Sequence, residues 1–138
     1  MLKVKFKKLH PEAKEPFKKH VGDAGYDLCA VADYELLPNV PTPVSAGICL
    51  QIPEGYYCEI HTRSSHGIKG IRNHLGVVDE GYHGEITVIM NSPVAYQVVK
   101  GDKVGQLIFK KRQGVQFVET EEEFTSDRGT NGFGSTGK

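Results

Sequence analysis

Residues 48–61 read ICLQIPEGYYCEIH, and their pattern is typical of β-structure. Apolar side chains occupy every second position over residues 48–52 and again over residues 56–60. A period of two residues puts alternate side chains on the same face of a strand. Residues 53–55, Pro-Glu-Gly, separate the two runs and favour a turn. The stretch therefore predicts two strands joined as a β-hairpin.

The same period continues through most of the chain. Further strands are predicted over residues 2–6, 86–90, 96–98, 104–109 and 115–118. The Gly101-Asp102 pair is interpreted as a hairpin turn. Residues 64–71 could form one short helix at most, because no segment has apolar residues at the spacing of a long helix. Short strands about ten residues apart predict an all-β sandwich or barrel.

Composition limits the compartment and the class of partner. A chain of 138 residues fits one domain, and its 17 Lys and Arg balance its 17 Asp and Glu. Because these formal charges cancel, the protein has no net positive charge to attract nucleic acid or an anionic membrane surface, and neither is an expected partner. No apolar run reaches the roughly 18 residues of a membrane-spanning helix, and the first nine residues lack the apolar block of a signal peptide. Three cysteines without CxxC spacing predict reduced, mostly buried thiols in a cytoplasmic protein.

Four polar clusters interrupt the strands. They are GDAGYDL (22–28), TRSSHG (62–67), GVVDEGYHGEI (76–86) and GDKVGQLIF (101–109). Taken singly, each has a plain structural interpretation, with Asp27 as a turn residue and Gln106 as a cross-strand filler. Together they combine arginine and serine, which bind phosphate, with Asp79 beside the flat ring of Tyr82. A polyanion that carries a sugar and a base would use all of these groups.

The C-terminal stretch RGTNGFGSTGK (128–138) is the fifth cluster. Glycines let backbone N–H groups approach an anion closely, and Arg128, Ser135 and Thr136 add phosphate donors. Phe133 offers a flat face for a base. A disordered Gly/Ser-rich tail is the alternative interpretation. The composition changes after Phe124, so we expect a globular domain over residues 1–124 and an arm over residues 125–138.

The five clusters, in this order and spacing, resemble the five motifs of the trimeric dUTPase family. The resemblance extends from Asp23 to Gly137, and GVVDEGYHG and RGTNGFGSTG are its most specific parts. It implies a distorted jelly-roll β-barrel or sandwich that assembles as a homotrimer, with each arm closing over a neighbour's active site. It also implies Mg²⁺-dependent hydrolysis of dUTP to dUMP and pyrophosphate. The metal would be held by substrate phosphates and water, with no direct protein ligand.

The resemblance implies a role for each matching residue. Asp79 would bind the 3′-hydroxyl and orient the attacking water, Gln106 would help to place water and phosphate, and Asp27 would face the water shell of the metal. Tyr82 would pack against the sugar and exclude a ribose. The full set of expected substrate-binding residues is Arg63, Ser64, Ser65, Gly67, Asn73, Gly76, Val78, Asp79, Tyr82, Gln106, Arg128, Phe133, Gly134, Ser135 and Thr136.

Two alternative functions use the same fold. A dCTP deaminase would need a glutamate in the strand after Gly84, where this chain has Ile89. A dUTP-sensing regulatory module would use the site as a switch for a protein partner, and the chain has no obvious insertion for that purpose. The six histidines match no zinc-binding pattern such as HExxH. Four positions depart from the commoner motifs of the family: Thr62, His66, His83 and Gly105.

Overall fold

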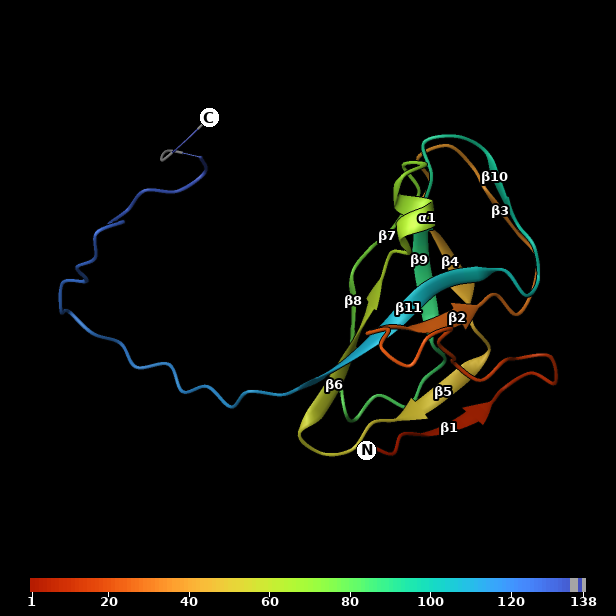
Figure 1. Cartoon of the computed structure of the whole chain (residues 1–138), viewed down its shortest axis with the longest axis horizontal. Coiled ribbons are helices and arrows are strands. Elements are labelled where there is room, and N and C mark those ends of the chain that lie inside the picture. The colour runs from red at the N-terminus through yellow and green to blue at the C-terminus, as the bar shows by residue number, and fades with distance from the viewer. Residues whose placement is uncertain (135–136, 138) are drawn as a thin grey trace.

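The computed structural model describes residues 1–134 and 137, and these residues form a β-body followed by a long arm (Figure 1). In chain order the elements are β1 (Lys5–Lys8), β2 (Tyr26–Cys29), β3 (Tyr34–Leu36), β4 (Thr42–Ser45), β5 (Ile48–Gln51), β6 (Tyr56–His61), α1 (Ser64–Gly67), β7 (Arg72–Asn73), β8 (Gly76–Val78), β9 (Thr87–Asn91), β10 (Tyr96–Val98) and β11 (Lys103–Lys111). The expected single short helix is confirmed as α1.

Four small antiparallel sheets build the body. The largest has the order β2-β11-β6-β8, so that β11 is paired along both edges. A three-stranded sheet has the order β4-β9-β7, and two ribbons pair β1 with β5 and β3 with β10. Neighbours in these sheets are mostly distant in sequence, as expected when strands cross between packed sheets.

The predicted hairpin over residues 48–61 is wrong. The turn forms, since the Tyr56 N–H donates to the Pro53 carbonyl at 3.2 Å. However, β5 pairs with β1, whereas β6 pairs with β11 and β8. Alternation determines which face of a strand is buried but not which strand lies beside it. The stretch therefore links two sheets at a corner of the sandwich.

The predicted hairpin at Gly101-Asp102 is wrong for the same reason. The Asp102 N–H donates to the Val99 carbonyl at 2.9 Å, and Gly101 has a φ of 91°, so the turn itself exists. Its flanking strands separate, because β10 pairs with β3 and β11 pairs with β2 and β6.

One apolar core fills the space between the sheets. In β6 the side chains of Cys58 and Ile60 are buried in it, whereas Tyr57, Glu59 and His61 lie on the opposite face. Leu107 from β11 is also fully buried in this core. The polar residues of β6 and β11 are therefore displayed on the outer face of the four-stranded sheet.

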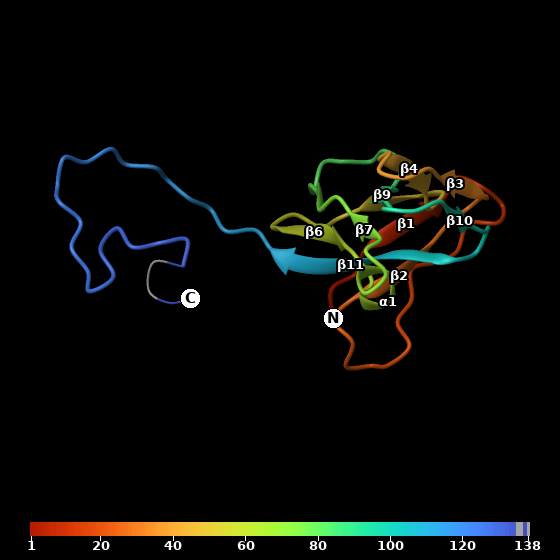
Figure 2. The ribbon, with the colours of Figure 1, turned by 90° about the horizontal axis from the view of Figure 1, so that it is seen from above.

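The predicted strand over residues 115–118 does not form. After Lys111 the chain leaves the body, and Figures 1 and 2 show the arm extended away from it in both views. Phe117 and Val118 are exposed there. Arg112 still contacts the body, with its N–H donating to the Gly55 carbonyl at 2.7 Å. A strand needs a partner for its backbone groups, and residues 115–118 have none within the described part of this chain.

The three cysteines are free thiols, as predicted. Burial raises the pKa of the Cys58 thiol to about 12, so this thiol is a protonated member of the core. Among the described residues, no helix is long and apolar enough to cross a membrane.

Candidate active site

Asp27 lies at the centre of a charged cluster on the outer face of β2. Its Oδ1 is 3.7 Å from Arg63 Nε and its Oδ2 is 3.4 Å from Lys103 Nζ. The Asp27 side chain is 18% exposed, which reduces screening by water. Two cations therefore neutralise one partly buried carboxylate.

Gln106 is the direct neighbour of Asp27 across the sheet. The pairing of β11 places Gln106 opposite Asp27 on one side and opposite His61 on the other. Its Nε2 donates to the Thr62 carbonyl at 3.4 Å. A Cβ atom at Gly25 would overlap the Gln106 side-chain amide, so the absence of a side chain there lets the amide lie against the backbone.

Arg63 precedes α1 and connects this helix to β11. Its Nη1 donates to the Lys103 carbonyl at 3.4 Å, and its own carbonyl accepts the Gly67 N–H at 2.9 Å. Ser64 and Ser65 are exposed beside it, and no side chain caps the helix. The two hydroxyls are thus exposed to solvent in the residues that follow Arg63.

Asn73 ties three strands together. Its Nδ2 donates to the carbonyls of His61 (3.2 Å) and Val104 (3.0 Å), and its N–H donates to Thr62 Oγ1 at 2.8 Å. A Cβ atom at Gly105 would lie 3.1 Å from Nδ2, which explains why this departure from the common motif suits the Asn73 contact. Asn73 Oδ1 is buried and has no hydrogen-bond partner in the described structure.

Asp79 and Tyr82 form a second cluster in the turn after β8. The Tyr82 N–H donates to the Asp79 carbonyl at 3.1 Å, and the Tyr82 hydroxyl donates to the Glu85 carbonyl at 3.0 Å. Both side chains are exposed, and the Tyr82 ring lies over Gly84, where a Cβ atom would come within 2.8 Å of Cε1. Asp79 and Tyr82 thus lie in one turn, and the orientation of the Tyr82 ring depends on Gly84.

A cavity of about 190 Å³ adjoins this turn. It is lined by Ile60, Gly76, Val77, Val78, Tyr82, Glu85, Ile86 and Thr87. The Val78 side chain is 5% exposed and belongs to the core, so this residue can meet a ligand only through its main chain.

Within one chain the cluster around Asp27 and Gln106 and the cluster around Asp79 and Tyr82 lie at different positions along the strands of the large sheet. Val78, next to Asp79, pairs with Cys58, whereas Gln106 pairs with His61. Three residues of strand correspond to about 10 Å. One chain therefore does not bring Asp79 and Tyr82 together with Asp27 and Gln106.

The arm residues lie apart from both clusters. Arg128 Nε donates to the Asn131 carbonyl at 2.8 Å, within the arm itself. Phe133 and Gly134 are exposed, with φ values of 50° and 80°. The expected contributions of Ser135 and Thr136 fall outside the described residues.

Lys103 is a site residue that sequence reasoning missed. The sequence places it in a turn, and its pairing partner on β2 is Cys29 rather than Asp27. An irregularity between Lys103 and Gly105 shifts the register and lets the Lys103 ammonium reach Asp27. The one signal in the sequence is its position three residues before Gln106.

His66 and His83, two departures from the common motifs, lie in different surroundings. His66 is buried in α1, with its ring edge-on to Tyr96 at 5.9 Å between centroids. Burial lowers the His66 pKa, and the Arg63 charge lowers it further. His83 lines a cavity of about 600 Å³ beside β1 and β5, away from α1.

Among the described residues, no three His, Cys, Asp or Glu side chains are grouped so as to hold a metal ion. Asp27 offers a carboxylate already balanced by two cations. This donor set fits a water-mediated contact to a cation bound elsewhere, and does not fit a direct protein cage.

A model of the dUTPase family matches residues 12–137. This chain belongs to the dUTPase family. A Thermobifida fusca protein described as deoxyuridine 5′-triphosphate nucleotidohydrolase is 39% identical to it, over 99% of this chain and 79% of that protein. A Helicobacter pylori protein of the same description is 36% identical, over 99% of this chain and 97% of that protein.

Solved dUTPase structures confirm the jelly-roll fold. The Staphylococcus bacteriophage 80alpha dUTPase with dUpNHpp has a TM-score of 0.91 and 25% identity, covering 99% of each chain. A mutant dUTPase from S. aureus phage phi11, described as coordinating a structural Mg(II) ion, has a TM-score of 0.82 and 23% identity. It covers 87% of this chain and 97% of the phage chain. These findings do not favour the deaminase or the regulatory module.

Proposed function

We propose that this dUTPase hydrolyses dUTP to dUMP and pyrophosphate, with water attacking the α-phosphorus. Its role is to lower dUTP and to supply dUMP for thymidylate synthesis in the cytoplasm. The observation that carries the proposal is the alignment of Asp27, Gln106 and Arg63 on one face of a sheet, within a chain of the dUTPase family.

The phosphate chain binds to groups around α1 and the arm. Arg63, Ser64 and Ser65 hold the α- and β-phosphates, since guanidinium and hydroxyl donors suit phosphate oxygens. The expected contribution of the Gly67 N–H is not included, because this N–H donates to the Arg63 carbonyl at 2.9 Å. The arm, residues 125–138, adds Arg128, Gly134, Ser135 and Thr136 at the γ-phosphate. Closure of this arm excludes water other than the nucleophile.

Asp79 acts on the attacking water. Its carboxylate hydrogen-bonds the 3′-hydroxyl and orients or deprotonates the water, while Gln106 positions the water against the phosphate. The Tyr82 ring packs against the deoxyribose, and its hydrogen bond to Glu85 holds it in place. A ribose 2′-hydroxyl would clash with this ring, which selects dUTP over UTP.

The uracil ring is read by the main chain near β7 and β8. Gly76 and Val78 present backbone donors and acceptors, and Asn73 Oδ1 is the unpaired acceptor beside them. Phe133 from the arm stacks over the base. A main-chain wall close to the ring leaves no space for the methyl group of thymine.

Mg²⁺ is the cofactor that the proposal includes. It supplies divalent charge on the phosphates, and a related phage protein is described with a structural Mg(II) ion. Asp27 would face the water shell of the ion through the carboxylate that Arg63 and Lys103 flank.

A homotrimer completes the site. The Asp79 cluster and the Gln106 cluster lie at different levels of one sheet, and the arm is far from both (Figures 1 and 2). Neighbouring copies bring these parts together, and exposed apolar residues between β11 and the arm, such as Phe117 and Val118, pack on a neighbour. A light-scattering mass three times that of one chain is the expected result.

Product analysis with four nucleotides tests the function. We expect rapid release of dUMP and pyrophosphate from dUTP with Mg²⁺, and far slower turnover of dTTP, dCTP and UTP. Deamination of dCTP, or binding of dUTP without hydrolysis, would refute the proposal. Equal turnover of UTP would refute the role of Tyr82.

A further inference from the structure

Three polar residues form a row across the outer face of the large sheet. Gln106 of β11 is paired with Asp27 of β2 and with His61 of β6. Directly paired residues in antiparallel strands place their side chains on the same face, about 5 Å apart. His61 therefore lies on the other side of Gln106 from Asp27, about 10 Å from it.

Glu59 holds the His61 ring in one orientation. Glu59 Oε1 lies 2.9 Å from His61 Nε2 and 2.9 Å from Lys110 Nζ. Hydrogen bonds from His61 and then from Lys110 lower the Glu59 pKa, so the carboxylate is charged at neutral pH. A charged carboxylate at Nε2 keeps the proton on that nitrogen and leaves Nδ1 for another ligand.

The His61 side chain is accessible and its backbone is anchored. The ring is 36% exposed, whereas Glu59 beneath it is 15% exposed. The His61 carbonyl accepts a hydrogen bond from Asn73 Nδ2 at 3.2 Å, which fixes the end of β6. The partly exposed His61 side chain thus lies on the same face of the sheet as Gln106.

We propose that His61 is a further phosphate-binding residue of this enzyme, donating from Nδ1 to a β- or γ-phosphate oxygen of the substrate on the side of Gln106 opposite Asp27. The inference deepens the proposed function, on which it rests. Arg63 and Lys103 supply positive charge on the Asp27 side of the row. His61 supplies a donor on the other side, so that an extended triphosphate meets donors along its length.

The protonated ring is the binding form. In the imidazolium, Nε2 donates to Glu59 and Nδ1 donates to phosphate.

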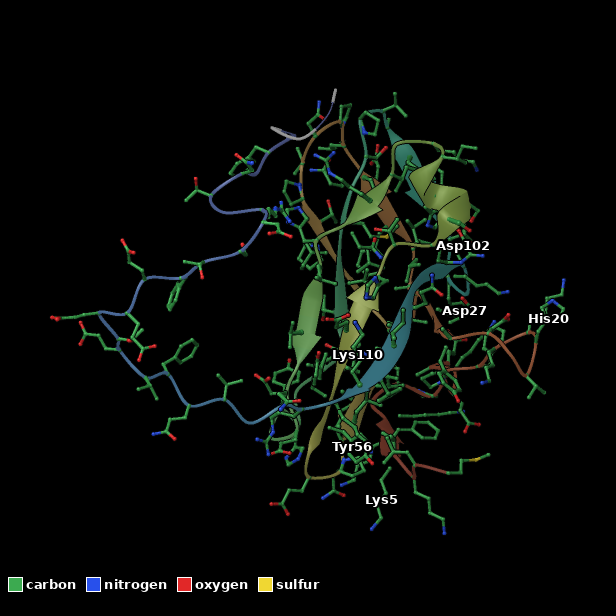
Figure 3. All side chains as sticks on the ribbon, turned by 60° about the vertical axis from the view of Figure 1, so that its left-hand side comes forward. Lys5, His20, Asp27, Tyr56, Asp102 and Lys110 are labelled. Carbon is green, nitrogen blue, oxygen red and sulfur yellow. The ribbon has the colours of Figure 1, made fainter. Side chains whose placement is uncertain are left out.

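Two isosteric replacements test which ring nitrogen is used. The amide nitrogen of His61→Asn lies near the position of Nδ1, and that of His61→Gln near the position of Nε2. Calorimetric titration with dUpNHpp and with dUMP, on the assembled full-length protein, measures affinity without turnover. His20→Ala is the matched control, because Figure 3 shows His20 on a loop away from Asp27 and Lys110.

We expect His61→Ala to weaken dUpNHpp binding about ten-fold while leaving dUMP binding and the light-scattering mass unchanged. His61→Asn should bind dUpNHpp more tightly than His61→Gln. Each of these results supports the inference.

An equal loss for dUMP and dUpNHpp, no loss at all, or tighter binding by His61→Gln than by His61→Asn would overturn it. Glu59→Gln gives an independent check should His61→Ala not fold, since it should weaken only the triphosphate. If the wild-type protein hydrolyses dUTP but the variants give these contrary results, only the role of His61 is refuted. If the wild-type protein does not hydrolyse dUTP, the proposed function is refuted as well.

Discussion

The Lys103 ammonium lies 3.4 Å from Asp27 Oδ2, whereas Arg63 Nε lies 3.7 Å from the other carboxylate oxygen, Oδ1. Lys103 also accepts a hydrogen bond from Arg63 Nη1 through its main-chain carbonyl. Lys103 thus contacts both an acid and a cation of the candidate site. Because the Lys103 ammonium also forms an ion pair with Asp27, the electrostatic attraction between Asp27 and Arg63 is weaker than it would be without Lys103.

Lys103→Met tests this effect. With one cation left, Asp27 should draw Arg63 towards itself and away from the substrate phosphates. We expect KM for dUTP to rise about ten-fold, because one charged hydrogen bond is weakened. Steady-state kinetics measure the change. Lys111→Met, at the far end of β11, is the control. Equal kinetics for the two variants would show that Lys103 has no part in substrate binding.

Asp79→Asn should remove most turnover and retain nucleotide binding. The asparagine amide cannot accept the proton of the attacking water as the Asp79 carboxylate can. Loss of a general base lowers the rate of a reaction by about 10²- to 10⁴-fold. Pyrophosphate release and dUpNHpp titration report the two properties separately. Because Asp79 is exposed, folding should be unaffected. A variant with normal kcat would exclude Asp79 from the reaction.

Removal of residues 125–138 should leave the body folded and nearly inactive. The described residues of this segment add nothing to the apolar core. Loss of the phosphate donors should lower kcat on the order of 100-fold. Thermal unfolding and turnover of dUTP are measured on the same preparation. A fall in melting temperature with normal turnover would instead show that the arm is structural.

Gly25→Ala should displace the Gln106 amide. The new Cβ would lie 3.0 Å from Gln106 Cδ, closer than packed side chains tolerate. We expect lower kcat, because the amide no longer positions water. Gly22→Ala is the matched control, since a Cβ there meets no atom within 4 Å. If both variants have wild-type kcat, the contact between Gly25 and Gln106 does not affect catalysis.

Stability should fall as pH drops below the ordinary histidine pKa of 6.5, in part because of His66. Burial lowers the folded-state pKa of His66, so just below pH 6.5 the unfolded chain binds the proton more readily. The contribution is complete above that pH and is lost progressively until the folded-state pKa is reached. His66→Gln, which does not titrate, should show a smaller decrease in melting temperature over this window. An unchanged decrease would assign the acid sensitivity to other groups.

The all-β fold class and several local features of the structure could be predicted from short stretches of sequence. Alternation over residues 56–60 identified the buried face of β6, and the polar cluster over residues 76–86 interrupts the strands as predicted, with Asp79 and Tyr82 in a turn after β8. The free cysteines were also expected. Each of these properties depends on neighbours within a few residues. The roles of Asp79 and Tyr82 came from resemblance to a family, and they stay predictions.

Strand partners could not be predicted. The sequence around Pro53 favours a hairpin, yet β5 pairs with β1 and β6 pairs with β11. Lys103 and Asp27 are 76 positions apart by their numbering, and a register shift in β11 brings them together. His61 becomes part of the candidate site only because β6 lies beside β11.

The chain's own order of residues determined which side chains face the core and where the backbone turns, because a period of two and the conformational freedom of glycine act over a few residues. Tertiary structure alone decided which polar residues share a surface. The backbone hydrogen bonds that pair two strands are chemically alike for every strand, so the choice of partner depends on how the whole core packs.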